Sequence, residues 1–382
     1  MVVDGSPTTS STNSPTRVPS AWRRVLWPDW PSRKRMLRVE AWGVVLASYL
    51  LLTLAYLWPQ NYRNESAGYV TVAWLAFLVR VLQFHLGLLL LAIALVAAFV
   101  RGRRLFFCAT PLVLFTIVPP LAGLLTRYPY HKPQPAVLSV MTCNLLMVNP
   151  DVTPLLNEML TYKPHVLLLQ EYTPRAHEAA KAALAADYPY SSFVTRDDSF
   201  GVAIYSRLPF VGEVDNRFPL GRAGVEQTRA VIRVGNRDVA VYNVHLLPPR
   251  RLDYTIDSRL QFADLCKALS EEKLPYVVAG DLNLTETTPQ HRDLKRLGAA
   301  DAHDSAGWAP GWTWPVNSIF RYVPGLRMDH VYVGNGLFVT RCETGEGYGS
   351  DHRPVIADVG WAASGPETAP GRAPTGGAPA RP

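Results

Sequence analysis

The sequence has few cysteines, and their spacing excludes one common class of site. Cys108, Cys143, Cys266 and Cys342 are the four cysteines among 382 residues. They include no CxxC pair, and none has the spacing of zinc ligands. We expect small buried hydrophobic side chains at these positions. A disulfide between Cys266 and Cys342 is left open.

Charged residues are also scarce, because one part of the chain is strongly apolar. They make up 18% of the sequence, against 48% hydrophobic residues. This charged fraction is low for a globular protein. The apolar residues are concentrated before Arg127, whereas the rest has the composition of an ordinary soluble domain. The sequence therefore predicts two parts of different character.

The two ends lack features of folded or cleaved segments. Residues 1–20 are rich in Ser, Thr and Pro and have no apolar core or cleavage site of a signal peptide. We expect residues 1–40 to be a disordered, basic, cytoplasmic N-terminus. Residues 361–382, rich in Pro, Gly, Ala and Thr, are expected to be a disordered tail.

Three apolar spans predict a three-helix membrane anchor over residues 41–126. They cover about residues 41–58, 81–100 and 105–126, each near the roughly 20 residues that cross a bilayer core. A shorter apolar stretch, 69–79, is expected to lie at the interface or to lengthen the second helix. Arg80 and His85 are expected near a helix end, reaching toward the interface.

Basic clusters predict the orientation of this anchor. The formal net charge is +7, and much of the excess lies before the first span and in the Arg101–Arg104 loop. Both regions should be cytoplasmic by the positive-inside rule. The third span then carries the chain outward, which predicts a multi-pass cell-membrane protein with an extracytoplasmic domain. Residues 127–135 should form a Pro-rich linker of roughly 25 Å, keeping that domain near the membrane.

Residues 136–360 predict a layered α/β domain. Runs rich in Val, Ile, Leu and Tyr predict strands, and apolar periodicity predicts helices between them. The expected strands are 136–144, 165–171, 201–206, 230–234, 238–246, 276–283, 328–333 and 354–359, and the expected helices are 152–160, 174–186 and 256–269.

Polar residues end several of these strands, where a layered α/β fold gathers its site. Each alone carries little weight, but together they match one chemistry. Mg²⁺ prefers hard oxygen ligands, and a His oriented by a carboxylate can handle protons. The oxygen ligands would be Asn144, Glu171 and Asp351; the histidines are His245 and His352, with Asp281 and Asp329 as partners and Asn283 beside them.

The order of these motifs resembles the endonuclease/exonuclease/phosphatase superfamily. The motifs are Asn144, QE at 170–171, NVH at 243–245, GDLN at 280–283, RMDH at 327–330 and SDH at 350–352. That group includes pancreatic-type deoxyribonucleases, abasic-site endonucleases, inositol phosphatases and neutral sphingomyelinases. The resemblance covers 136–360 and implies a four-layer α/β/β/α sandwich with a catalytic site at its top.

The resemblance also implies roles for the site residues. Glu171 would be the main ligand of Mg²⁺, or of Mn²⁺, with Asn144 and Asp351 nearby. His352, oriented by Asp329, would handle the phosphate and proton transfer. Asp281 would orient or deprotonate the water, while Asn283 and His245 would hold the phosphate. The general base is left open between Asp281 and His352.

The combination of three spans and this domain resembles the VanJ-type branch, which is associated with glycopeptide and teicoplanin resistance. This resemblance implies a cell-envelope substrate. Because the linker keeps the site near the membrane, the leading hypothesis is hydrolysis of a lipid-linked phosphate or diphosphate, such as undecaprenyl pyrophosphate, with the bilayer as a partner. The alternatives are an extracellular nuclease, a sphingomyelinase-like phospholipase or a non-catalytic receptor. Nucleic acid is less favoured because no lysine-rich stripe is present. The aromatic segment 307–325 is expected either to pack in the core or to meet the bilayer.

Overall fold

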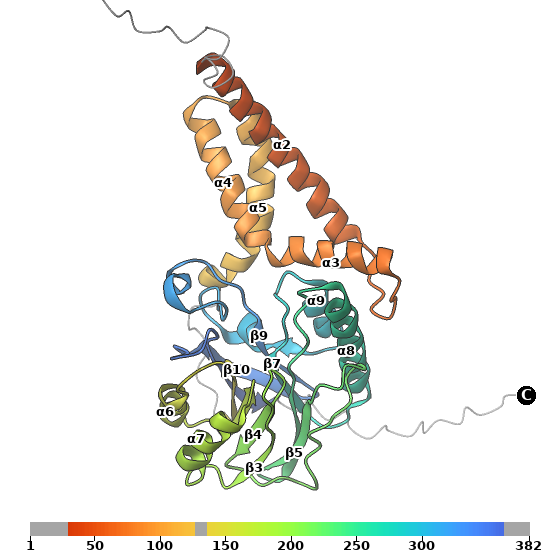
Figure 1. Ribbon diagram of the computed structural model, residues 1–382, viewed down its shortest axis with the longest axis vertical. Helices are drawn as coiled ribbons and strands as arrows, with labels where there is room; N and C mark the ends of the chain where they lie inside the picture. The colour runs from red at the N-terminus through yellow and green to blue at the C-terminus, as the bar shows by residue number, and fades with distance from the viewer. Residues whose placement is uncertain (1–29, 127–135, 363–382) are drawn as a thin grey trace, which may run out of the picture.

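The structure, a computed structural model, describes residues 30–126 and 136–362. A bundle of helices stands on one end of a β-sandwich (Figure 1). Most of the expected disordered N-terminus, the linker 127–135 and the tail from 363 lie outside the described residues.

The first helix begins earlier than expected. Helix α2 runs from Trp30 to Leu57, so residues 30–40 are helical rather than part of a disordered N-terminus. This stretch contains Arg33, Lys34, Arg35 and Met36, which are good helix formers. The helix therefore extends beyond the apolar span into its basic flank.

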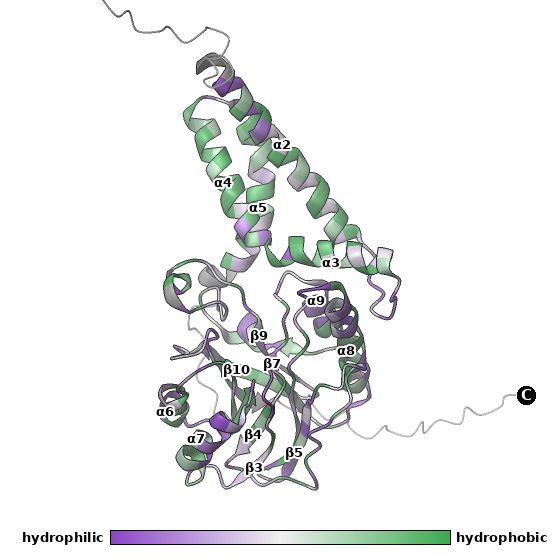
Figure 2. Ribbon diagram, viewed as in Figure 1, coloured by the Kyte–Doolittle hydropathy of each residue, from purple (hydrophilic) through white to green (hydrophobic). Residues whose placement is uncertain are grey.

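Two helices are long and apolar enough to cross a membrane by themselves. They are α2 and α5 (Arg103–Thr126). Helices α3 (Ala67–Val81) and α4 (Gln83–Phe99) qualify only together, and they are bent by 59° at the break between them. Figure 2 shows mainly apolar colour along α4 and along the part of α5 far from the sandwich. Within the described residues there are thus two candidate spans, or three if the bent pair is one span.

The short apolar stretch 69–79 forms most of a separate helix, α3. It lies across the base of the other helices, between them and the sandwich (Figure 1). Phe77 and Val81 join a hydrophobic cluster of the sandwich, and the Trp74 indole donates a hydrogen bond to the carbonyl of Pro249. The anchor and the sandwich are therefore packed together, not merely connected.

The sandwich contains two mixed sheets. The first has the order β10-β11-β1-β2-β4-β3, and the second has the order β5-β6-β7-β9-β8. Their strands are β1 (Leu138–Asn144), β2 (Val166–Gln170), β3 (Tyr190–Val194), β4 (Val202–Ser206), β5 (Thr228–Val234), β6 (Arg237–Asn243), β7 (Tyr276–Asp281), β8 (Ala300–Asp301), β9 (Asp329–Gly334), β10 (Leu337–Thr344) and β11 (Val355–Trp361).

Helices cover the outer face of each sheet. Those on the first sheet are α6 (Thr153–Tyr162) and α7 (Pro174–Leu184), whereas α8 (Leu252–Glu271) and α9 (Pro289–Arg296) pack with the second. A short helix, α10 (Ala302–Ala306), follows β8, and a 3-10 turn covers Ser318–Tyr322. This arrangement confirms the α/β prediction and gives the expected order of layers.

Alternation along the strands explains how the layers form. Val140 of β1 belongs to the cluster between the sheets, whereas Met141 and Cys143 belong to the cluster under α6 and α7. Successive strand residues point to opposite faces, so an almost wholly apolar strand is buried on both sides. Strands β3, β8 and β10 were not expected. They lie at sheet edges, and their shortness or mixed polarity weakens the strand pattern.

Candidate active site

The expected site residues come together where strands of both sheets meet at one end of the sandwich. Asn144 ends β1, Asp281 ends β7 and Asp329 begins β9. Strand β7 is antiparallel to β9 with Asp281 opposite Asp329. Backbone pairing therefore sets the two carboxylates side by side.

Glu171 follows β2 and is held by two hydrogen bonds. Its φ of 54° lies in the left-handed region of backbone conformation, which residues other than glycine rarely adopt. Oε1 accepts from Asn144 Nδ2 at 3.2 Å, and Oε2 accepts from the Met147 backbone at 2.6 Å. The Asn144 amide also lies 3.2 Å from Asp281 Oδ2. Asn144 thus connects the carboxylates of the two sheets.

Asp281 lies between two histidines. Its Oδ2 is 3.6 Å from His245 Nε2 and 3.8 Å from His352 Nε2, and all three residues are buried. Burial raises the pKa of Asp281 above its ordinary value, with the charge of Asp329 adding to the rise, while His352 opposes it. A carboxylate with a raised pKa is better suited to accept a proton near neutral pH.

His352 is paired with Asp329 through its other ring nitrogen. Nδ1 of His352 lies 2.8 Å from Asp329 Oδ2. Burial alone would lower the pKa of His352, but the charges of Asp329 and Asp281 outweigh it and raise the pKa to about 10. The ring is therefore an imidazolium at neutral pH when no cation is near, as suits a group that holds a phosphate.

Asn283 and His245 flank this pair of acids. Asn283 has a φ of 50°, donates its backbone N–H to Asp281 Oδ1, and donates its side-chain amide to the Leu246 carbonyl. The Nδ1 atom of His245 is buried and has no hydrogen-bond partner within the described ranges. A buried polar atom without a partner is costly, so this atom is available to a ligand.

Several residues that sequence reasoning did not assign to the site position its members. Thr313 Oγ1 accepts from the backbone N–H of Met328 and Asp329. Trp314 Nε1 donates to Asp351 Oδ2 at 3.0 Å. From sequence, the segment 307–325 that contains both residues is expected either to pack in the core or to meet the bilayer. Its polar contacts arise from loop folding, so the sequence carries no local sign of them.

Of the other residues that hold the site in place, some belong to the sequence motifs and some do not. Ser350 of the SDH motif donates to the Asn144 carbonyl and accepts from the His352 backbone. Gln227 makes two hydrogen bonds with the backbone of His245, although no motif marks it. Asp351 is expected to bind the metal. In this structure it accepts from Trp314, and its role as a ligand stays a prediction.

The residues present suit a hard divalent cation. Glu171, Asp281 and Asp351 supply carboxylates. The Asn144 amide oxygen accepts from the Leu146 backbone in this structure, so its role as a ligand stays a prediction. Asp329 Oδ1 is buried without a hydrogen-bond partner among the described residues, and ligand atoms of Asp281, Asp329 and His352 lie within 4.8 Å of one another. This excess of buried acid is the setting in which a cation is favoured.

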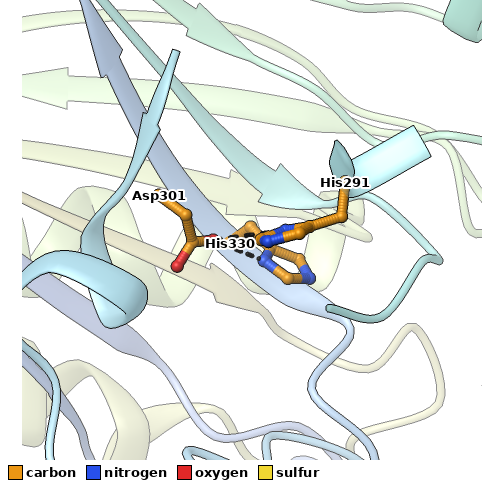
Figure 3. Close-up of side chains that lie close together, drawn as sticks. All are labelled: His291, Asp301 and His330. Carbon is orange, nitrogen blue, oxygen red and sulfur yellow. Dashed lines mark hydrogen bonds and ion pairs between the residues drawn. The ribbon is translucent and has the colours of Figure 1, made fainter. Parts of the chain in front are cut away.

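A second group of histidines and acids has a different character. Figure 3 shows Asp301 beside His291 and His330. The two histidines also bond to Tyr332 and to backbone carbonyls, respectively, while Arg327 donates to Asp301 at 2.7 Å. Burial alone would raise the pKa of Asp301, but Arg327 and His330 hold it below its ordinary range. Asp301 is thus already paired with Arg327 and His330, and we interpret this group as a structural ion-pair network.

Comparison with solved structures gives fold-level likenesses. An endonuclease/exonuclease/phosphatase from Beutenbergia cavernae is 23% identical, with 59% of this chain and 72% of that chain covered and a TM-score of 0.47. A humanized D. rerio TDP2 is 18% identical, with 58% and 98% covered and a TM-score of 0.47. The human Nocturnin catalytic domain with bound sulfate is 17% identical, with 59% and 94% covered and a TM-score of 0.45.

Comparison with curated proteins gives no match. The sequence profile of one family, in contrast, matches residues 141–352, which is more than half of the chain. That range contains every candidate site residue from Asn144 to His352. Members of the family hydrolyse phosphoesters and typically use a divalent metal. This chain belongs to the Endonuclease/Exonuclease/phosphatase family.

Proposed function

We propose that this protein is a membrane-anchored, Mg²⁺-dependent hydrolase of lipid-linked phosphate or diphosphate at the outer face of the membrane. The observation that carries this proposal is that the candidate site lies at the end of the sandwich next to the anchor helices. Asn283 and Leu246, beside the catalytic acids, line a small cavity together with Trp74 and Phe77 of α3. The end of the sandwich that carries Asn283 thus lies against helix α3 of the anchor.

The site residues support hydrolysis at a phosphorus centre. The imidazolium of His352, held by Asp329, neutralises charge on the phosphate. Asp281, whose pKa is raised, accepts a proton from the attacking water. His245 and Asn283 lie on either side and contact the phosphate oxygens. Mg²⁺ held by Glu171, Asn144 and Asp351 would supply further charge stabilisation and acidify water.

The positions of the basic clusters support an extracytoplasmic site. Arg33, Lys34 and Arg35 lie in the first turns of α2, and Arg101–Arg104 joins α4 to α5. Both lie at the end of the bundle far from the sandwich (Figure 1). If the basic end is cytoplasmic, the sandwich is outside.

Exposed apolar residues beside the anchor support a lipid substrate. In the segment 307–325, Ile319 is 70% exposed and Tyr322 is 87% exposed. The same segment touches the start of α4, where Trp312 packs on Phe84 and the Pro324 carbonyl bonds to His85. Exposed apolar groups at this position suit a bilayer surface or lipid tail. A VanJ-type role in glycopeptide resistance extends the proposal.

A hydrolysis panel on the full chain in micelles, with the products separated by chromatography, tests the proposal. The substrates are a polyprenyl diphosphate, a phosphatidylcholine, sphingomyelin and single-stranded DNA, each with Mg²⁺. Hydrolysis of the polyprenyl diphosphate, abolished in Glu171→Ala, is the expected result. Preferential cleavage of DNA would establish the nuclease alternative, and preferential cleavage of sphingomyelin would establish the phospholipase alternative. No turnover of any substrate would favour a non-catalytic receptor.

A further inference from the structure

A groove of about 500 Å³ lies between the anchor helices and α9, apart from the catalytic residues. We call it the seam groove. Its lining residues come from both parts of the chain: Tyr56, Arg80, Gln83, Phe115, Pro119, Glu286, Thr287, Thr288, His291, Arg292, Lys295, Arg296 and Asp304. None of the candidate catalytic or metal-binding residues belongs to this set.

A buried guanidinium without a carboxylate partner lies in this groove. Arg80 is 5% exposed, its Nε donates to the Thr287 carbonyl at 2.5 Å, and its guanidinium lies 4.1 Å from the centre of the Tyr56 ring. Within residues 30–126 and 136–362, no carboxylate lies at ion-pairing distance from it. A buried charge is costly unless it is paired, so the position favours an anionic ligand.

The rim of the groove adds further positive charge. Arg292, Lys295 and Arg296 project from α9, and their side chains are 40%, 48% and 67% exposed. Four basic and two acidic side chains line the groove, which leaves a net charge of +2. Of the two acids, Asp304 pairs with Lys295, and Glu286 lies 3.7 Å from Arg327 outside the groove.

The basic side chains of the rim are only partly neutralised by carboxylates, so they can still bind an anionic ligand. Arg292 and Arg296 both contact the same oxygen of Asp293. One carboxylate is therefore shared between two guanidinium groups. Exposed pairs of this kind are weak, so a phosphate can compete for their free N–H groups, which match phosphate oxygens well.

The other wall of the groove consists of membrane-helix residues. Tyr56 lies near the end of α2, and Phe115 and Pro119 lie in the second half of α5. The Tyr56 hydroxyl donates to Gln83 Oε1 at 2.6 Å, which closes this wall with a polar contact. The groove is therefore apolar toward Phe115 and Pro119 of α5 and basic toward α9, with Arg80 of α3 at its floor.

We propose that the seam groove binds the phosphate headgroup of an anionic membrane lipid, with Arg80 at its floor and Arg292, Lys295 and Arg296 at its rim. Phosphate is the anion that these groups recognise, and the adjoining helices place a lipid source beside it. The inference rests on the proposed membrane anchoring but not on the proposed hydrolysis. A lipid bound here would contact α2, α5 and α9 together and hold anchor and sandwich in one arrangement.

Native mass spectrometry of the full chain in detergent micelles tests this site. Phosphatidylglycerol, phosphatidylcholine and inorganic phosphate are titrated separately. We expect one tight phosphatidylglycerol adduct, bound about tenfold more strongly than phosphatidylcholine. Equal binding of the two lipids would overturn the proposal. Saturation by inorganic phosphate at concentrations where phosphatidylglycerol shows no advantage would assign the groove to free phosphate and overturn the lipid assignment.

Two groove variants and one matched control locate the adduct. Each lost cation should weaken phosphatidylglycerol binding roughly fivefold, so Arg80→Gln and the exposed Arg296→Gln should both bind it less. Arg175→Gln on α7, an exposed position away from the anchor, should bind as the unchanged chain does. Because Arg296 is exposed, its variant stays informative even if Arg80→Gln fails to fold. Unchanged binding in Arg296→Gln combined with Lys295→Gln would refute the site.

Discussion

Oδ2 of Asp329 lies 2.8 Å from Nδ1 of His352, and both side chains are buried. The contact leaves Nε2 of His352 directed at Asp281. A carboxylate in this position fixes which ring nitrogen faces the reaction and stabilises the imidazolium. The two sheets contribute to the arrangement separately, since Asp329 belongs to β9 and His352 precedes β11.

We expect Asp329→Asn to lower kcat by on the order of 10⁴, the precedent for an orienting Asp in a triad. The amide cannot stabilise the imidazolium, and it can reverse the ring's tautomer. Asp358→Asn, which removes only a surface partner of Arg341, is the matched control and should retain activity. Steady-state kinetics on a soluble diphosphate measure both. Near-normal turnover in Asp329→Asn would show that Asp329 does not orient a catalytic His.

Mg²⁺ should bind through Glu171 before any substrate is present. Chelator should abolish activity, and added Mg²⁺ should restore it, because the site gathers hard oxygen ligands. Mg²⁺ should also raise the Tm of the unchanged chain by stabilising the folded state. Glu171→Gln should lose both effects, whereas Glu178→Gln on the exposed face of α7 should keep them. Full activity in chelator would contradict the metal assignment.

Arg327→Met should destabilise the protein by about 3–5 kcal/mol, because it leaves the buried Asp301 without its cation. Arg341→Met removes an exposed guanidinium and should cost about 0–1 kcal/mol. Denaturant unfolding at pH 7 compares the two. Equal effects would mean that the Arg327 network contributes no more than a surface pair.

The same network predicts a pH dependence of stability. The folded-state pKa of Asp301 lies below its ordinary value, so its stabilising contribution is present above the unfolded pKa of about 3.9. That contribution is lost as pH falls through the folded-state pKa. The difference in unfolding free energy between the unchanged chain and Arg327→Met should therefore be largest above pH 4 and shrink below it. A constant difference down to pH 2 would contradict this assignment.

The orientation of the chain can be measured with paired reporters. A reporter that is active only outside the cytoplasm should work when fused after Gly360. The same reporter inserted in the Arg101–Arg104 loop should be silent, since the positive-inside rule places that loop in the cytoplasm. The reverse pattern would remove the basis for an envelope substrate.

The sequence predicts where the candidate site residues lie better than it predicts the residues around them. Asn144, Asp281 and Asp329 can be placed because each adjoins a strongly apolar strand, whose end fixes its position. Thr313 and Trp314 cannot, because their contacts with Asp329 and Asp351 depend on the path of a long loop. Such loops carry no periodic pattern.

A contact between residues far apart in the sequence also explains why the observed position of Arg80 differs from the expected one. From sequence alone, a charged residue beside an apolar span is expected to reach the interface. In the structure Arg80 is buried and donates a hydrogen bond to the Thr287 carbonyl. Thr287 lies 207 residues further along the chain, so the local sequence does not predict this contact. The extension of α2 to Trp30 has a simpler cause, since helix-forming residues continue beyond the apolar span.

The bend between α3 and α4 determines how the candidate site is positioned relative to the helices of the anchor. Because α3 is continuous with a membrane helix through Leu82 and also packs into the sandwich core through Phe77, the catalytic end cannot swing as it would on a tether. If these helices cross a bilayer as proposed, the packed contact sets the height and tilt of the site above the membrane. Substrate choice would then depend on the distance of a phosphate from the membrane surface as well as on its chemistry.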